Sequence, residues 1–486
     1  MDPTGSRRRF LVAGVTGLVA AACGRSVADT AGPSHRWLPP ASVEIWLGGV
    51  APTVEHVVRT DVLPSLRSAY PNLRVTIAGT APIGFRSGTG RPTVGLQGSS
   101  LGLAAGINPA VLGSAGGRQP SLALRGPTSD GDAFNRLIAE HAAGIPSDVV
   151  PAGTGNVSTL RHLRLARPVE DRDLLVDLRG DFTAASVAQV TTRSGVVGVP
   201  WLANPRRFVW RADVLASSGV NVPRTWEEVV LACNRGPSGR TRTAAGRRLV
   251  AVNGLHLEFY EGLRRYGVAP VEFGRAAFAG DEGIAVAQYL ADRGQTDTVS
   301  RNATGSTVMS DLAAQGVVGA WTTLAGVLRV ITATPSRVAE LRVGPPTVPG
   351  GSGYPADGTS SGTIATHSLW YVARESRVPD HAWELVRALV DPDALVAVAA
   401  TSGQVPTRRS AAVRGFLRIP IISEFVAPYL DDGIEAPALP IPVEMESVLL
   451  NRLNAIARGE VSPRKALLEA ARLWDEATAK AGHDEA

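Results

Sequence analysis

Between residues 43 and 77 the chain changes its hydrophobic periodicity twice, and this change limits the possible folds more than any other feature. Residues 43–47 have the pattern of a strand, and residues 54–70 place apolar side chains at helical spacing. A Pro-Asn turn at 71–72 then leads into a second strand at 74–77. Two strands joined by a helix form a β-α-β unit with parallel strands. The sequence therefore predicts an α/β fold.

Helical and strand-like segments continue to alternate along the chain, and from residue 379 the tail is mostly helical. At 486 residues the chain is too long for one hydrophobic core, and its 44% hydrophobic residues suffice for two or three packed units. Thr225 and Glu228 have the spacing of a capping box, so a longer helix is expected to begin there. We also expect helices over 130–143 and 213–219, and strands over 149–150, 196–201 and 208–210.

Two segments lack such periodicity. Residues 23–41 are small and polar with several prolines, a composition typical of a flexible tether. Residues 79–127 are rich in Gly, Ser and Pro and are too long for an ordinary connection inside a compact domain. We interpret them as an insertion that is partly disordered.

The first 22 residues have the features of an export signal. Residues 6–12 (SRRRFLV) resemble the twin-arginine consensus, in which Arg7 and Arg8 are read by a receptor at the membrane. The apolar stretch at 11–22 is shorter than the roughly 20 residues that cross a bilayer. Residues 20–24 (AAACG) resemble a bacterial lipobox, although Ala20 stands where Leu, Val or Ile is more usual. This resemblance implies lipid attachment at Cys23; the alternative is a plain cleaved signal with an incidental cysteine.

Composition argues against several other classes. The formal charge is +5, but the arginines are scattered and form no basic run with interleaved aromatic residues, so nucleic acid is a poor candidate partner. With Cys23 acylated, Cys233 has no disulfide partner and is expected to be a buried small side chain. No Cys or His spacing resembles a zinc or haem site. We expect no metal and no cofactor.

Eight segments resemble, in order, those of the family 1 extracellular solute-binding proteins, the maltose-binding-like lipoproteins of ABC importers. The resemblance covers roughly residues 42–480 apart from the insertion, and it departs from the family where Trp210-Arg211-Ala212 replaces a Tyr-Asn-Lys triplet. The segments are PSDV (146–149), GVPW (198–201), FVWRADVL (208–215), PRTWEE (223–228), GAW (319–321), SRVPDHAWE (376–384), GQVPTR (403–408) and GEVSPRKAL (459–467).

The resemblance implies a two-lobed periplasmic-binding-protein fold with a hinge and an interlobe ligand cleft. Such proteins close around a ligand by bending at the hinge. Lobe I is expected to comprise 42–154 and 350–405, and lobe II to comprise 155–349 and 406–480. The implied function is capture of a small polar solute, by preference a sugar or oligosaccharide, for ABC permease subunits. The protein would be an exported monomer, lipid-anchored to the outer face of the cytoplasmic membrane, and not an enzyme.

A sugar site needs flat aromatic surfaces and fixed hydrogen-bond partners. The candidate aromatic residues are Trp201, which follows a strand end, and Trp321, which lies in the Gly-x-Trp segment. Phe259 and Tyr260 are further candidates, because they lie where relatives present aromatic side chains. The alternative for each of the four is a position in the core. The candidate polar partners are Asn204, Gly49, Ser361 and Arg408. Their alternatives are turn chemistry or, for Arg408, a solvated surface pair with Arg409. We assign Trp46, Trp226, Trp370, Trp383 and Trp474 to packing.

Two other functions stay open at the level of sequence. A binding protein that feeds a sensor or acts as an adhesin could have the same fold. No motif of a serine hydrolase, nucleotide-binding loop or zinc protease is present, but a glycoside-acting enzyme needs only two carboxylates that are close in space.

Overall fold

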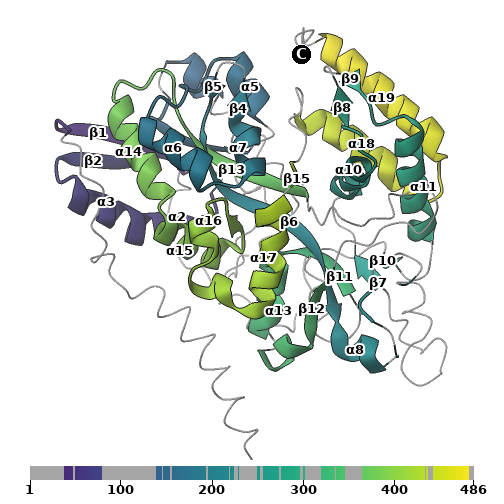
Figure 1. The fold of residues 1–486 in the computed structure, drawn as a ribbon. Helices are drawn as coiled ribbons and strands as arrows, with labels where there is room; N and C mark the ends of the chain where they lie inside the picture. Colours follow the sequence, from purple (N-terminus) through teal and green to yellow (C-terminus); the bar gives the residue numbers. More distant parts are fainter. Residues whose placement is uncertain are drawn as a thin grey trace, which may run out of the picture. The chain divides into compact units, whose positions relative to one another are not determined.

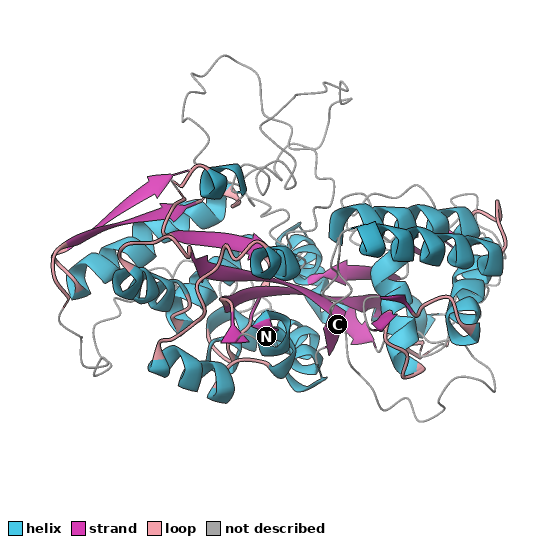
Figure 2. Ribbon diagram, turned by 90° about the horizontal axis from the view of Figure 1, so that it is seen from above, coloured by secondary structure: helices cyan, strands magenta, loops and turns pink. Residues whose placement is uncertain are grey.

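The computed structural model describes the chain in two compact units. Unit 1 contains the described residues of 204–365 and 418–486, and unit 2 contains those of 38–203 and 366–417. Both units contain helices and strands, which confirms the predicted α/β class (Figure 2). The described residues are 38–47, 50–78, 138–144, 146–153, 156–192, 195–217, 219, 221–223, 228, 249–251, 255–272, 275–295, 299–300, 319–333, 335–344, 364–432, 434–435 and 442–480.

Unit 2 is built around the predicted β-α-β unit. Strands β1 (Ala41–Trp46) and β2 (Leu73–Ala78) are parallel and pair along their whole length (Figure 1). Between them the chain forms helix α2 (Pro52–Val57), a π-helical turn (Val58–Val62) and helix α3 (Leu63–Ala69). The periodicity at 43–77 is therefore confirmed as a parallel strand pair with a helical crossover.

The sheet of unit 2 continues from β1 through β3 (Val149–Gly153), which is parallel to β1, to β13 (Ile364–Val372), which is antiparallel to β3. The first part of β6 (Val199–Arg211) is the next strand, and it pairs with the short β14 (Val405–Pro406). The helices of this unit are α5 (Val157–His162), α6 (Arg172–Gly180), α7 (Ala184–Val190), α14 (Pro379–Leu389), α15 (Pro392–Ser402) and α16 (Arg409–Ala412).

Side-chain caps and apolar faces explain these helices. Asp171 caps α6 by accepting a 2.9 Å hydrogen bond from the backbone N–H of Leu174, and Asp391 caps α15 in the same way. Gly403 ends α15 in the left-handed region with φ 67°, which a glycine adopts without steric cost. The apolar faces bury a cluster against the sheet that includes Trp46, Leu160 and Leu369.

In unit 1, the second part of β6 lies between two antiparallel partners, β11 (Gly319–Thr323) and β12 (Leu341–Gly344). Four helices pack against one another beside it: α10 (Leu255–Arg265), α11 (Asp281–Gln295), α18 (Pro442–Ala457) and α19 (Pro463–Lys480) (Figure 1). Their core includes Phe259, Phe278, Leu453, Leu467 and Trp474.

Smaller elements complete the described part of the chain. Helix α13 (Leu324–Ala333) follows β11, and α17 (Pro420–Asp432) begins the second stretch of unit 1. The remaining elements are α8 (Ala212–Ser217), the 3-10 turns Pro335–Glu340 and Gly415–Arg418, and the short strands β4 (Thr191–Thr192), β5 (Gly195–Val196), β7 (Leu249–Ala251), β8 (Val271–Glu272), β9 (Arg275–Ala276), β10 (Val299–Ser300) and β15 (Ile434–Glu435).

One prediction was wrong. The two strands expected over 196–201 and 208–210 are a single strand, β6, that runs through Asn204 and Pro205. Its partner β14 ends opposite Ala203 and its partner β11 begins opposite Arg206. Pro205 lies between these two ladders, so its missing N–H interrupts neither of them.

Among the described residues, the chain passes from one unit to the other after residue 203 inside β6, after 365 inside β13, and after 417. The described part of each unit therefore comes from two separate stretches of sequence. The lobe borders predicted at 154, 349 and 405 stay a prediction.

Trp46, Trp370, Trp383 and Trp474 are buried, as predicted, while Trp226 lies outside the described residues. None of the helices in the described ranges combines the length and the apolar character needed to cross a membrane.

Candidate functional site

Strand β6 exposes a small polar surface in unit 1. Of its thirteen residues, only Asn204 and Arg206 are half-buried; the others are buried. Alternate side chains of a strand point to the same face, so Asn204 and Arg206 share one face of the sheet. These two residues form the polar part of β6, whose other residues are buried.

The neighbouring strand β11 adds to the same face. Thr323 is paired directly with Arg206, and Trp321 with Phe208. Directly opposite residues of an antiparallel pair share a face. Thr323 is half-buried, and the guanidinium carbon of Arg206 lies 5.0 Å from the centre of the Trp321 ring. Asn204, Arg206 and Thr323, with Trp321 beneath the guanidinium, are called the polar patch below.

The polar patch carries a positive charge. Burial lowers the pKa of Arg206 to about 10, and the charge of Glu258 on α10 acts in the opposite direction. Arg206 therefore stays protonated at neutral pH. Guanidinium, amide and hydroxyl groups can donate and accept hydrogen bonds to a polar solute.

The other predicted aromatic residues lie in the cores. Trp201 is fully buried in unit 2, with its ring 4.8 Å from that of Trp370. Phe259 and Tyr260 are fully buried in the helical core of unit 1, where the Phe259 ring contacts Phe278. Trp321 belongs to the same core and has 4% of its surface exposed. Of the predicted aromatic residues, only Trp321 borders the polar patch.

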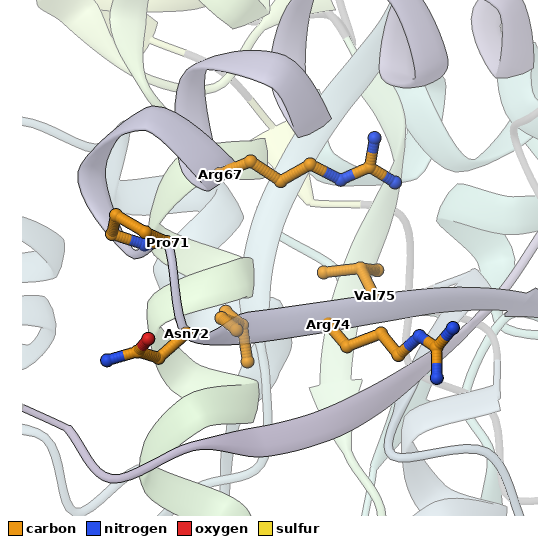
Figure 3. A pocket seen from close by; sticks show the side chains of 6 residues that line it. Arg67, Pro71, Asn72, Arg74 and Val75 are labelled. Carbon is orange, nitrogen blue, oxygen red and sulfur yellow. The ribbon is translucent and has the colours of Figure 1, made fainter.

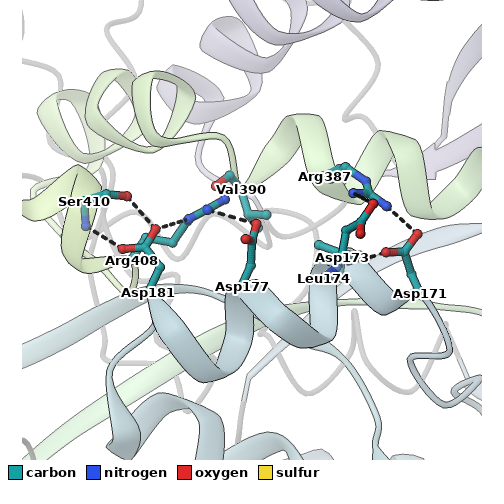
Figure 4. A network of polar contacts seen from close by, with 9 residues as sticks. All are labelled: Asp171, Asp173, Leu174, Asp177, Asp181, Arg387, Val390, Arg408 and Ser410. Carbon is teal, nitrogen blue, oxygen red and sulfur yellow. Dashed lines mark hydrogen bonds and ion pairs between the residues drawn. The ribbon is translucent and has the colours of Figure 1, made fainter. Parts of the chain in front are cut away.

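Arg408 lies in unit 2 and binds protein groups (Figure 4). Its guanidinium donates to Asp181 at 2.8 Å, to Asp177 at 3.0 Å and to the backbone oxygen of Val390 at 3.2 Å. These contacts hold α6 against the chain at 390–410. These contacts indicate that Arg408 has a structural role in unit 2.

Burial alone would raise the pKa of Asp181, but two neighbours reverse this effect. The Ser410 hydroxyl donates to its carboxylate at 2.5 Å and the Ser410 N–H at 2.8 Å, while Arg408 adds a hydrogen bond and a positive charge. Together they hold the pKa of Asp181 below its usual value. A second arginine, Arg387, pairs with Asp171 at the start of the same helix.

Five of the predicted positions lie outside the described residues. They are the loop residues Gly49 and Ser361, the lipid-attachment residue Cys23, and the export-signal residues Arg7 and Arg8.

A second candidate site is a hollow of about 500 Å³ in unit 2, between the end of α3 and the start of β2 (Figure 3). It is lined by Arg67 and Arg74 together with Pro71, Asn72, Leu73 and Val75. Ligands of open α/β sheets bind at the carboxyl ends of the strands. The hollow lies at the amino end of β2, so its position does not favour solute capture.

One partly buried cluster, formed by His141, Tyr371 and the exposed Glu375, has the order of groups found in hydrolases. His141 contacts the Glu375 carboxylate at 3.0 Å and the Tyr371 hydroxyl at 3.2 Å. Burial, and then the charges of Glu375 and Glu140, raise the pKa of Tyr371. A phenol whose ionisation is suppressed is a poor nucleophile. Within the described ranges, no group of three or more His, Cys, Asp or Glu side chains could hold a metal ion.

Sequence reasoning missed Arg206, Thr323 and Glu258. The one available signal was Arg206-Arg207, two charges within the otherwise uncharged segment 196–210. Arg207 is buried and donates to the backbone oxygen of Gly344 at 3.3 Å, so the two arginines have different roles. Local pattern could not distinguish them, since the pairing of β6 with β11 decides which one borders Trp321.

Comparison with solved structures identifies similar folds among sugar-binding proteins. Maltose-bound MalE3 of T. maritima is 18% identical, with 89% of this chain and 99% of that chain covered and a TM-score of 0.64. The sugar-binding protein MalE of Xanthomonas citri is 16% identical over 90% and 98% of the two chains, with a TM-score of 0.68. The GacH receptor of Streptomyces glaucescens is 14% identical over 90% and 97%, with a TM-score of 0.63.

These similarities show the fold, which is that of two-lobed periplasmic binding proteins. A comparison with curated protein sequences finds no match. The family model for the bacterial extracellular solute-binding protein matches residues 125–416. Since this match spans more than half of the sequence, the chain belongs to the bacterial extracellular solute-binding proteins, a family of exported binding proteins.

Proposed function

We propose that this protein is the substrate-binding component of an ABC importer, and that it captures a sugar or oligosaccharide for delivery to a membrane permease. The polar patch is the observation that supports a small polar ligand. Asn204, Arg206 and Thr323 offer hydrogen-bonding groups on one sheet face, and Trp321 lies beside them. Sugars present hydroxyl groups at the rim, and these hydroxyl groups have hydrogen-bonding partners here.

The comparisons support the same ligand class. MalE3 of T. maritima is bound to maltose, and the GacH receptor was solved in complex with acarbose and an acarbose homologue. The export signal with Arg7 and Arg8 and the lipobox cysteine Cys23 support a protein held at the outer face of the cytoplasmic membrane. We include Asn204 and Trp321 of the predicted residues in the proposed site, and we add Arg206 and Thr323.

The proposed function is tested by a thermal-shift screen of residues 24–486 against monosaccharides, oligosaccharides, polyols and phosphodiesters, followed by calorimetric titration. A ligand at 100 times its dissociation constant should stabilise the folded protein by about 2.7 kcal/mol. We expect Thr323→Val and Asn204→Ala each to weaken binding about tenfold, the effect of one hydrogen bond of about 1–1.5 kcal/mol.

The matched control is Thr332→Val. Thr332 is exposed on α13, and its hydroxyl donates to the backbone oxygen of Leu328 within the same helix. This variant should bind the ligand like the unmodified protein. A folded protein that shifts with no compound of the panel would contradict solute binding and point to a protein or polymer partner.

A further inference from the structure

We propose that Arg206 determines ligand specificity, and that the preferred solute carries an acidic group, a carboxylate or a phosphate, on its polyhydroxy body. This inference rests on the proposed solute-binding function and narrows its ligand class. It concerns unit 1 alone, where the polar patch, β11 and α10 all lie.

Arg206 is placed to contact a ligand by the register of two strands. It follows Asn204 on the exposed face of β6 and lies opposite Thr323. The indole of Trp321 holds its guanidinium by a cation–π contact at 5.0 Å. A guanidinium is planar, and the cation–π contact restricts its orientation, so that its N–H donors can match a carboxylate or phosphate with two parallel hydrogen bonds.

The positive charge of Arg206 favours an acidic ligand over a neutral one. Burial lowers the pKa of Arg206 to about 10 and the charge of Glu258 acts in the opposite direction, so the guanidinium is protonated at neutral pH. A partly buried cation attracts the charge of an anionic ligand more strongly than the dipoles of a neutral one. A neutral sugar supplies only hydroxyl dipoles at the same position.

Arg207 does not compete for this role, because its side chain points to the other face of β6. It is buried, lies opposite Thr322 and donates to the backbone oxygen of Gly344. Of the two consecutive arginines, one therefore ties strand to strand and the other faces the polar patch.

The test compares sugars that differ only in one acidic group. Dissociation constants of the unmodified protein are measured by calorimetry at low salt for glucose, glucuronate and glucose 6-phosphate, and for galactose, galacturonate and galactose 6-phosphate. We expect an acidic member of one series to bind at least tenfold more tightly than its neutral parent. The carboxylate and phosphate arms then identify which anion the site accepts.

Variants assign the effect to Arg206. Arg206→Gln should reduce the preference for the acidic sugar to less than threefold, and Arg206→Lys, which keeps the charge but loses the planar fork, should retain part of it. The control is Arg342→Gln, which removes an equal charge from an exposed position on β12. This control should leave the preference unchanged.

The outcomes separate the inference from the proposed function. If a neutral sugar binds as tightly as its acidic partners, the role of Arg206 is overturned while solute binding stands. If the preference survives in Arg206→Gln or disappears in Arg342→Gln, Arg206 is not its source. If none of the six sugars binds but another compound of the screen does, the acidic-sugar inference alone is overturned.

Discussion

Trp210 shows how single residues set the packing of β6. Its indole is fully buried between two glycines, Gly319 on β11 and Gly344 on β12. A Cβ on Gly319 would lie 2.3 Å from Cε3 of the indole, and a Cβ on Gly344 would lie 2.3 Å from its Nε1. Both neighbouring strands therefore need a residue without a side chain where the indole lies across them.

Trp210-Arg211-Ala212, which replace the family's Tyr-Asn-Lys triplet, include two residues with structural roles. Trp210 fills the space between the two glycines, and the buried Arg211 pairs with Asp213 at 2.5 Å and Glu340 at 3.0 Å. A buried arginine is tolerated when carboxylates balance its charge. Trp210 and Arg211 therefore hold β6 in place and do not form part of the polar patch.

At this scale we predict the effect of adding one methyl group. Gly319→Ala should destabilise the protein by about 1–3 kcal/mol, since the indole of Trp210 is enclosed and cannot move aside without cost. The free energy of unfolding is measured by urea denaturation. Gly180→Ala is the control: a Cβ there meets nothing within 4 Å, and alanine favours the helix by up to about 1 kcal/mol. Equal midpoints for Gly319→Ala and the unmodified protein would rule out the packing described.

Helix α6 is fastened to unit 2 by side chains at both of its ends (Figure 4). Asp171 and Arg387 pair at its start, and Asp181 accepts hydrogen bonds from Arg408 and Ser410 at its end. Next to this, the backbone N–H of Thr183 donates to the oxygen of Thr407. Polar contacts thus hold a helix whose apolar face is narrow, with Leu174 and Leu178 as its buried residues.

This fastening should depend on pH. The folded protein lowers the pKa of Asp181. The contribution of Asp181 to stability is therefore complete above its pKa in the unfolded chain, about 3.9, and is lost as the pH falls through its lower pKa in the folded protein. Asp181→Asn should therefore cost about 1–2 kcal/mol at pH 7, an estimate reduced for partial exposure. The difference from the unmodified protein, followed by denaturation from pH 7 to 2.5, should shrink below pH 4.

The same helix provides the control for that experiment. Asp173 contacts Arg387 at 3.4 Å, but its side chain is 82% exposed. Asp173→Asn should change stability by less than about 0.5 kcal/mol at every pH. A loss in Asp181→Asn that is as large at pH 2.5 as at pH 7 would show that shape, rather than charge, explains the effect.

Over the whole molecule, local periodicity was sufficient for the elements but not for the site. The β1–α3–β2 unit could be predicted because each of its segments repeats with its own period over neighbouring residues. Trp201 and Phe259 could not be assigned to the core from the sequence. Their burial depends on partners, Trp370 and Phe278, that no local sequence pattern connects to them. The polar patch likewise depends on a strand register that no local window contains.

The proposed membrane attachment would concern the whole molecule, and it would depend on one residue of the proposed lipobox. A diacylglyceryl group on Cys23 supplies two acyl chains, which suffice for stable anchoring. We expect the unmodified protein to partition into the detergent phase of a Triton X-114 extraction, and Cys23→Ala to appear in the aqueous phase. Equal partitioning of the two proteins would favour the alternative of a plain cleaved signal.

The passages of the described chain between the units determine when each unit can fold during synthesis. The sheet of unit 2 combines β1 and β2 with β13 and β14 from a much later part of the sequence. The core of unit 1 likewise combines Phe208 of β6 with Trp474 of α19. Native contacts therefore join residues far apart in sequence, which slows folding. Neither unit can complete its core before its second stretch of sequence has been synthesised.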